Sequence, residues 1–138
     1  MDVRPDGKMF VHATRRGCIL EIWKNNESSI SPYVVKRFFK PNYISSNRDM
    51  KFSRVSENVD DPYGIFQLSC SNRYIYAIYD SEPNRRSSKI AVFDWKGNPQ
   101  RLYIGNKDLL AIDVDNDNTV YALAINDDDN IELISIPL

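Results

Sequence analysis

The sequence predicts an all-β protein in which antiparallel four-stranded meanders repeat along the chain. Three observations support this prediction. Apolar and polar residues alternate in short runs, which is the period of a half-buried strand. Asn, Asp and Gly stand at the ends of these runs, where tight turns need left-handed backbone conformations. Aromatic residues make up 12% of the chain, including eight Tyr, and they favour strands.

Three stretches of the chain share one pattern. Residues 5–24, 71–98 and 115–138 each begin with a turn, continue as an alternating strand, and close with a second strand after a polar connection. Corresponding positions Ile75 and Tyr121 lie 46 residues apart. This spacing fits repeats of ~40–50 residues, the size of a propeller blade.

The middle copy is complete. Four strands are predicted in a row, at residues 65–70, 74–79, 90–95 and 99–105. Four short antiparallel strands in a meander make one blade of a β-propeller. We therefore assign residues 62–105 to a complete blade.

The flanking copies are incomplete. Residues 1–41 hold predicted strands at 9–13, 19–23 and 33–40, preceded only by the stub "MDV". Residues 106–138 hold predicted strands at 109–115, 120–124 and 131–136, and lack a last strand. The fold class is therefore a partial β-propeller of about three blades, in one domain over residues 1–138.

Residues 42–61 form an insertion between the first two blades. This segment is rich in Ser, Asn and Asp, so we predict a loop. Long loops are uncommon without a role of their own.

Composition excludes several classes of protein. Net charge is −1, so no global field recruits nucleic acid. The 42% hydrophobic and 27% charged residues are typical of a soluble globular domain. No apolar run reaches the ~18 residues that a membrane-spanning helix needs. The N-terminal "MDVRPDGKMF" has no basic segment followed by an apolar one, so we expect no signal peptide in this chain.

Few residues offer catalytic chemistry. We interpret Cys18 and Cys70 as two small buried residues, with a disulfide as the alternative. His12, the single histidine, is interpreted as structural or surface-exposed, and one histidine makes a conventional triad hard to build. Trp23 and Trp95 occupy matching places in two repeats, so we predict that both pack between blades.

The segment "DVDNDN" is the main candidate cation site. Asp113, Asp115 and Asp117 have the 1-3-5 spacing of a calcium loop. That loop also needs Gly at its sixth position and Glu at its twelfth, where this chain has Asn118 and Ala124. We therefore interpret the segment as a polar hairpin turn, with calcium at the three aspartates as the alternative and no other cofactor expected.

Two kinds of charged segment are interpreted as solvated surface. Residues 126–130, "NDDDN", fall where the last hairpin turns, and a weak cation site is the alternative. Basic residues form local spots that could bind phosphates or an acidic partner. These spots are residues 85–89 with Arg15, Arg16, Lys36, Arg37 and Lys40.

Two quoted stretches carry a family resemblance. "YIYAIYDSE…SSKIAVFDWKGNPQRLY" and "LLAIDVDNDNTVYALA…IELISI" resemble the C-terminal blades of TolB-like six-bladed β-propellers, a bacterial cell-envelope family whose members are often predicted lipoproteins. The resemblance is best over residues 62–138 and implies a location in the cell envelope or periplasm. It implies no catalytic residue at any position of this chain.

These observations favour a non-enzymatic binding or scaffold module with a protein or small-molecule ligand. Incomplete end blades expose apolar faces and strand edges, so we expect self-association, or a separate missing half, to complete the propeller. One alternative is a metal-dependent hydrolase-like propeller, for which "DVDNDN" is the only candidate site. The other is a truncated, non-functional remnant.

Overall fold

The computed structural model describes residues 1–40, 43–49, 52–57, 60–80, 87–115 and 119–137, with backbone only for those between 43 and 57. All regular elements in these ranges are strands. They are β1 (Asp2–Val3), β2 (Met9–Ala13), β3 (Ile19–Asn26), β4 (Ser29–Arg37), β5 (Tyr43–Asp49), β6 (Phe52–Glu57), β7 (Gly64–Cys70), β8 (Tyr74–Asp80), β9 (Lys89–Asp94), β10 (Pro99–Ile104), β11 (Asp108–Val114), β12 (Thr119–Ile125) and β13 (Ile131–Pro137).

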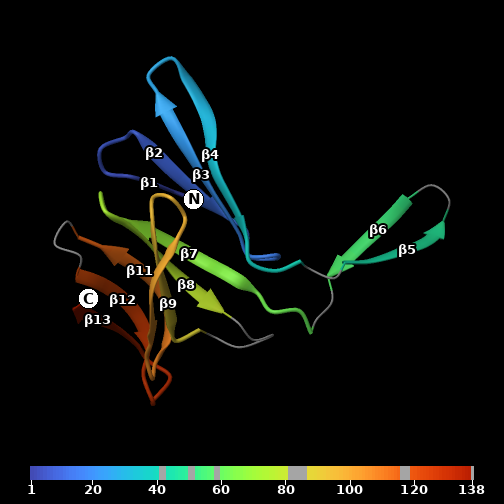
Figure 1. Ribbon diagram of the computed structural model, residues 1–138. Coiled ribbons are helices and arrows are strands. Elements are labelled where there is room, and N and C mark those ends of the chain that lie inside the picture. The colour runs from blue at the N-terminus through green and yellow to red at the C-terminus, as the bar shows by residue number, and fades with distance from the viewer. Residues whose placement is uncertain (41–42, 50–51, 58–59, 81–86, 116–118, 138) are drawn as a thin grey trace.

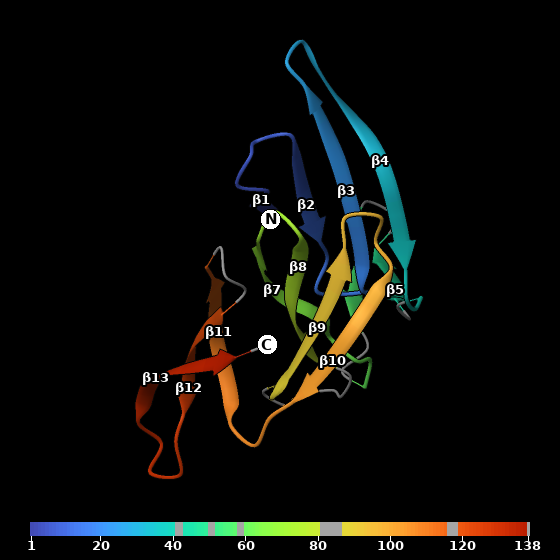
Figure 2. The ribbon, with the colours of Figure 1, turned by 60° about the vertical axis from the view of Figure 1, so that its left-hand side comes forward.

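The strands form three antiparallel meanders and one separate hairpin. Blade 1 has the order β1-β2-β3-β4, blade 2 the order β10-β9-β8-β7, and blade 3 the order β11-β12-β13. Figure 2 shows the three sheets in chain order, with blade 2 in the middle. Strand β7 contacts β1 and β2 on one side and β11 on the other. The predicted fold class, a partial propeller of antiparallel blades, is therefore confirmed.

One prediction is corrected by the backbone. The insertion predicted as a loop over residues 42–61 contains the antiparallel hairpin β5–β6. Figure 1 shows this hairpin extending away from the three blades. A strand outside the core needs no continuous apolar face, because backbone hydrogen bonds hold the pair. The polar composition of this segment therefore does not exclude strands, and the prediction of a loop was wrong for β5 and β6.

Two hydrophobic cores lie between neighbouring blades. The first joins blades 1 and 2 and includes Val11, Leu20 and Ile75, all fully buried. The second joins blades 2 and 3 and includes Ile78 and Val120, also fully buried. Because side chains of a strand alternate between faces, β8 supplies both cores from successive residues.

Blades 1 and 2 approach each other closely at Gly64. Its φ is +86°, a conformation that favours glycine. A Cβ at this position would lie 2.7 Å from the Cβ of Cys18. The first residue of β7 therefore packs against the loop between β2 and β3.

Both cysteines are buried as predicted from the sequence, whereas only one of the two tryptophans packs between blades. Cys18 and Cys70 are both buried and free, so they form no disulfide with each other. Trp95 is buried, and its Nε1 donates a hydrogen bond to the carbonyl of Ser71 at 3.2 Å. Trp23 instead stacks on Phe10 with ring centroids 6.0 Å apart. Trp23 lies on the face of blade 1 that looks away from blade 2, so the prediction of blade packing is not met there.

No part of the described chain forms a helix long and apolar enough to cross a membrane.

Candidate functional site

The first strands of blades 2 and 3, β7 and β11, are neighbours. They are joined by side-chain hydrogen bonds rather than by backbone pairing. The Gln67 amide donates from Nε2 to the carbonyl of Ile112 at 3.3 Å, and its Oε1 accepts from the N–H of Ile112 at 2.9 Å. Ser69 Oγ donates to Asp113 Oδ1 at 2.9 Å and accepts from the N–H of Val114 at 3.0 Å. These bonds satisfy backbone groups of β11 that would otherwise lack partners, so they hold the two blades in register.

A cavity of about 190 Å³ opens at one end of these inner strands. All three blades contribute to it: the β2–β3 loop of blade 1, the start of β7, the end of β8 and the start of β11. The lining residues are Arg15, Tyr63, Phe66, Asp80, Ser87, Leu109 and Leu110. Clefts where several elements converge are the usual places for ligands, and we name this one the axis-end cavity.

Arg15 and two aromatic rings line the axis-end cavity together. The Arg15 Cζ lies 4.3 Å from the ring centroid of Tyr63 and 5.3 Å from that of Phe66. The Arg16 Cζ lies 4.0 Å from the same Tyr63 ring. Each such contact is worth about 0.5–1 kcal/mol at an exposed site. Arg15 is exposed and makes no ion pair within the described part of the chain, so its guanidinium can receive an anion.

Two further lining residues of the axis-end cavity are polar but buried. Asp80 is 7% exposed and Ser87 is 7% exposed. The Ser87 hydroxyl donates to the carbonyl of Tyr79 and accepts from the N–H of Lys89 at 3.1 Å, so the backbone engages it. The cavity thus combines a guanidinium, a carboxylate and apolar side chains, which can hold and orient a small ligand.

The described residues offer no activated nucleophile to this cavity. Burial raises the pKa of the Cys18 thiol to about 11, and burial also raises the pKa of Cys70. Both thiols therefore stay protonated at neutral pH, and the thiolate is the reactive form. His12 Nδ1 lies 3.3 Å from Glu21 Oε2 on the face of blade 1 that looks away from blade 2. It is therefore not placed to serve as a base at the axis-end cavity.

The predicted cation site is described only in part. Asp113 Oδ1 accepts from Ser69 and from the N–H of Val114 at 2.9 Å, which directs it toward β7. Asp115 Oδ1 accepts from the N–H of Thr119 at 2.9 Å, within the β11–β12 connection. Asp117 lies outside the described residues, so the calcium site stays a prediction. No cluster of three metal-ligating side chains occurs within the described ranges.

The other predicted charged segments are also placed in part. Asn126 Oδ1 accepts from the N–H groups of Asp128 and Asn130 at 3.0 and 2.9 Å, which closes the hairpin turn between β12 and β13. Within "RRSSK", Arg85 and Arg86 fall outside the described residues.

The sequence predicts a basic spot at Arg15 and Arg16 but does not predict their aromatic partners. Tyr63 and Phe66 stand near the start of β7, 45 or more residues further along the chain. The signal that could have found them is "YGIF", two aromatic residues around the glycine that opens an innermost strand. Only the approach of blade 1 to blade 2 brings these rings under the arginines.

Comparison with known proteins agrees with the architecture. A family model described as TolB-like 6-blade propeller-like matches residues 1–117. Searches of curated proteins and of solved structures find no match. The matched range includes all of blades 1 and 2 and the first strand of blade 3. The chain belongs to the TolB-like 6-blade propeller-like family.

Proposed function

We propose that this protein is a non-enzymatic binding module that holds its ligand at the axis-end cavity. The observation that supports this function is the convergence of three blades on one cavity, with the Arg15 guanidinium spread over two aromatic rings. A guanidinium pairs with carboxylates in a bidentate geometry, and the apolar wall can cover a small hydrocarbon group. The family points to the bacterial cell envelope as the location.

A pair of small probes tests the binding function. Benzoate carries a carboxylate on an aromatic ring, and benzylamine carries the opposite charge on a similar ring. In NMR titrations of the labelled protein we expect benzoate to shift the amide signals of Leu109 and Leu110 and the side-chain signal of Arg15. Arg15→Gln should remove this response, whereas Arg37→Gln, which removes an exposed charge elsewhere, should keep it. The proposal would be contradicted if Arg15→Gln and Arg37→Gln responded equally to benzoate, or if neither probe shifted any signal.

We further propose that a second copy of the chain completes the propeller. The outer face of blade 3 exposes apolar side chains where a further blade could pack. They are Tyr121 at 43%, Leu123 at 41%, Ile131 at 65% and Leu133 at 71% exposure. The outer face of blade 1 carries the Phe10–Trp23 stack and Val35, which is 42% exposed. Exposed apolar patches of this kind mark interaction surfaces.

Symmetry favours two copies. Three blades of a six-bladed ring cover half a turn, so a two-fold axis along the centre would close the ring. Each of the two interfaces would then pair the outer face of blade 1 in one copy with the outer face of blade 3 in the other. A closed ring removes both exposed faces, which is how propellers protect their edges.

Light scattering after size exclusion tests the assembly. We expect a mass twice the 16.0 kDa of one chain. Leu133→Lys places a charge in the proposed interface and should give a monomer. Leu102→Lys changes a residue of blade 2 that is 53% exposed, and it should leave the dimer intact. A wild-type monomer at high micromolar concentration would overturn this part of the proposal.

A further inference from the structure

A second cavity, of about 160 Å³, lies on the face of blade 2 that looks toward blade 3. It is at the opposite end of β8 from the axis-end cavity, because Tyr74 begins this strand and Asp80 ends it. Six residues of its wall are polar or aromatic: Arg73, Tyr74, Tyr76, Gln100, Arg101 and Tyr103. We call this site the tyrosine–arginine cavity.

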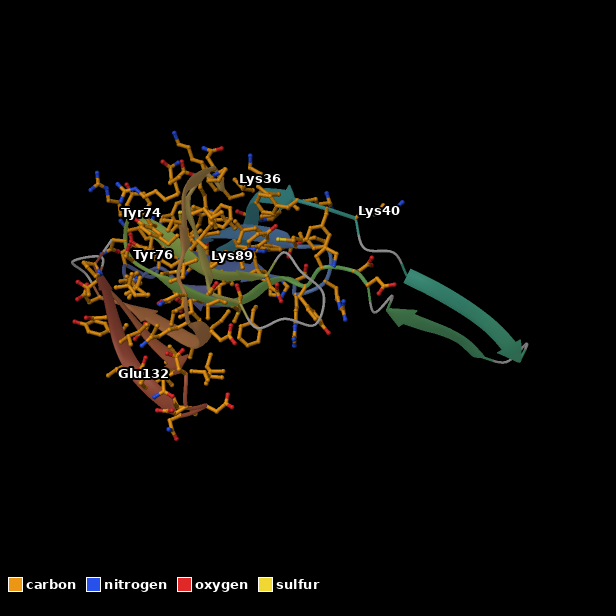
Figure 3. The ribbon with its side chains drawn as sticks, turned by 90° about the horizontal axis from the view of Figure 1, so that it is seen from below. Lys36, Lys40, Tyr74, Tyr76, Lys89 and Glu132 are labelled. Carbon is orange, nitrogen blue, oxygen red and sulfur yellow. The ribbon has the colours of Figure 1, made fainter. Side chains whose placement is uncertain are left out.

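Two tyrosines of β8 line the tyrosine–arginine cavity. The rings of Tyr74 and Tyr76 meet edge to face, with centroids 6.4 Å apart. Figure 3 shows these two side chains next to each other on the body of the protein. Tyr76 is 2% exposed, and burial raises the pKa of its phenol. The phenol therefore keeps its proton at neutral pH.

Tyr103 positions one of the two arginines. Arg101 Nη1 donates to the Tyr103 hydroxyl oxygen at 3.1 Å. Because the tyrosine oxygen accepts this bond, its own O–H proton remains to be donated elsewhere. The second arginine, Arg73, has its Cζ 5.6 Å from the Tyr74 ring centroid. Both guanidinium groups thus lie at the rim of one small cavity.

The charge of the tyrosine–arginine cavity is positive. Neither Arg73 nor Arg101 forms an ion pair in the described ranges, and both are exposed. Among the described residues, Asp94 brings a carboxylate to the wall, where its Oδ2 accepts from Gln100 Nε2 at 3.1 Å. Asp94 also accepts bonds from Lys96 and Asn98 in the β9–β10 turn. The carboxylate oxygens of Asp94 therefore already accept hydrogen bonds within this turn. The guanidinium groups of Arg73 and Arg101 face the cavity opening.

We propose that the tyrosine–arginine cavity binds a tetrahedral oxyanion, the phosphate group of a small ligand. Two guanidinium groups supply forked N–H donors that match phosphate oxygens, and Tyr103 adds an O–H donor. Tyr74 offers an aromatic face to an organic group attached to the phosphate. This site lies within one chain, and all of its lining residues belong to blade 2. It therefore depends neither on ring closure nor on a ligand in the axis-end cavity.

Thermal melting with matched variants gives the first test. Phosphate stabilises many proteins nonspecifically at high concentration, so the experiment uses low millimolar phosphate against sodium chloride of equal ionic strength. We expect phosphate to raise the melting temperature of the wild type and of Lys40→Gln, which removes a charge remote from the cavity (Figure 3). Arg73→Gln and Arg101→Gln should lose the shift. A shift that is the same in all four proteins, or absent from the wild type, would overturn the proposal.

NMR titration gives the second test and identifies the source of the anion. Inorganic phosphate and phenyl phosphate should each move the side-chain N–H signals of Arg73 and Arg101. Tyr103→Phe keeps the ring, removes the hydroxyl and should weaken phosphate binding at least threefold. Tighter binding of phenyl phosphate would assign the site to an organic phosphate, and equal binding would assign it to the free ion. Unchanged arginine signals with both probes would overturn the proposal.

Discussion

Strands β8 and β13 are both largely apolar in sequence, yet they differ in what covers them. In β8 the residues from Ile75 to Ile78 are all buried, because blade 1 covers one face and blade 3 the other. In β13 one face packs on blade 2, while Ile131 and Leu133 are 65% and 71% exposed. A strand's own pattern therefore does not decide how much of it is buried. The number of neighbouring blades does.

The largest expected effect concerns the central strand β8. Ile78→Ala removes a fully buried side chain from the core between blades 2 and 3. We expect a loss of about 2–5 kcal/mol in the free energy of unfolding, from lost burial and the cavity left behind. Ile30→Ala, at a position 62% exposed in β4, should change it by less than about 0.5 kcal/mol. Urea denaturation measures both, and similar losses would show that blade 3 does not cover β8 in solution.

A second effect tests the contact between blades 1 and 2. Gly64→Ala would place a Cβ 2.7 Å from the Cβ of Cys18 and strain a backbone with φ of +86°. Gly7→Ala has similar strain, with φ of +71°, but nothing lies within 4 Å of the added Cβ. Left-handed strain alone costs about 1–2 kcal/mol. We expect Gly64→Ala to cost clearly more than Gly7→Ala in chemical denaturation, and equal costs would contradict the close approach.

A pH-dependent effect tests the burial of Cys18 at the same contact. Burial raises the pKa of its thiol from 9.0 to about 11 in the folded protein. Between these values the unfolded chain releases the proton while the folded chain keeps it, so stability should fall as pH rises from 9 to 11. Cys18→Ala should show a smaller fall over this range in melting experiments. An identical fall in the variant would mean that other groups cause it.

The smallest expected effect concerns blade 3. If residues 113–118 form only a turn, millimolar calcium should leave the melting temperature unchanged, because a ligand stabilises the folded state only by binding it. Asp113→Asn serves as the matched variant. A calcium-dependent rise that this variant loses would establish the cation site and favour a metal-dependent propeller.

Much of the fold could be predicted because strand alternation and turn residues are local signals. Strand β2 begins and ends as expected, and the four strands of blade 2 fall within a residue or so of the predicted ranges. The hairpin β5–β6 was missed because it has little apolar pattern, and backbone pairing leaves no mark on composition. Of the candidate site, the sequence predicts Arg15 as part of a basic spot but does not predict that it lines a cavity.

Local sequence patterns alone predict that the chain forms antiparallel blades in series. The period of two and the Asn, Asp and Gly turns act between near neighbours, so they can be read along the chain. Only the packing of one blade on another buries Trp95 but not Trp23, and brings Tyr63 and Phe66 into contact with Arg15. These outcomes depend on which face of a blade has a neighbour. They arise from contacts between residues far apart in sequence, which no local pattern encodes.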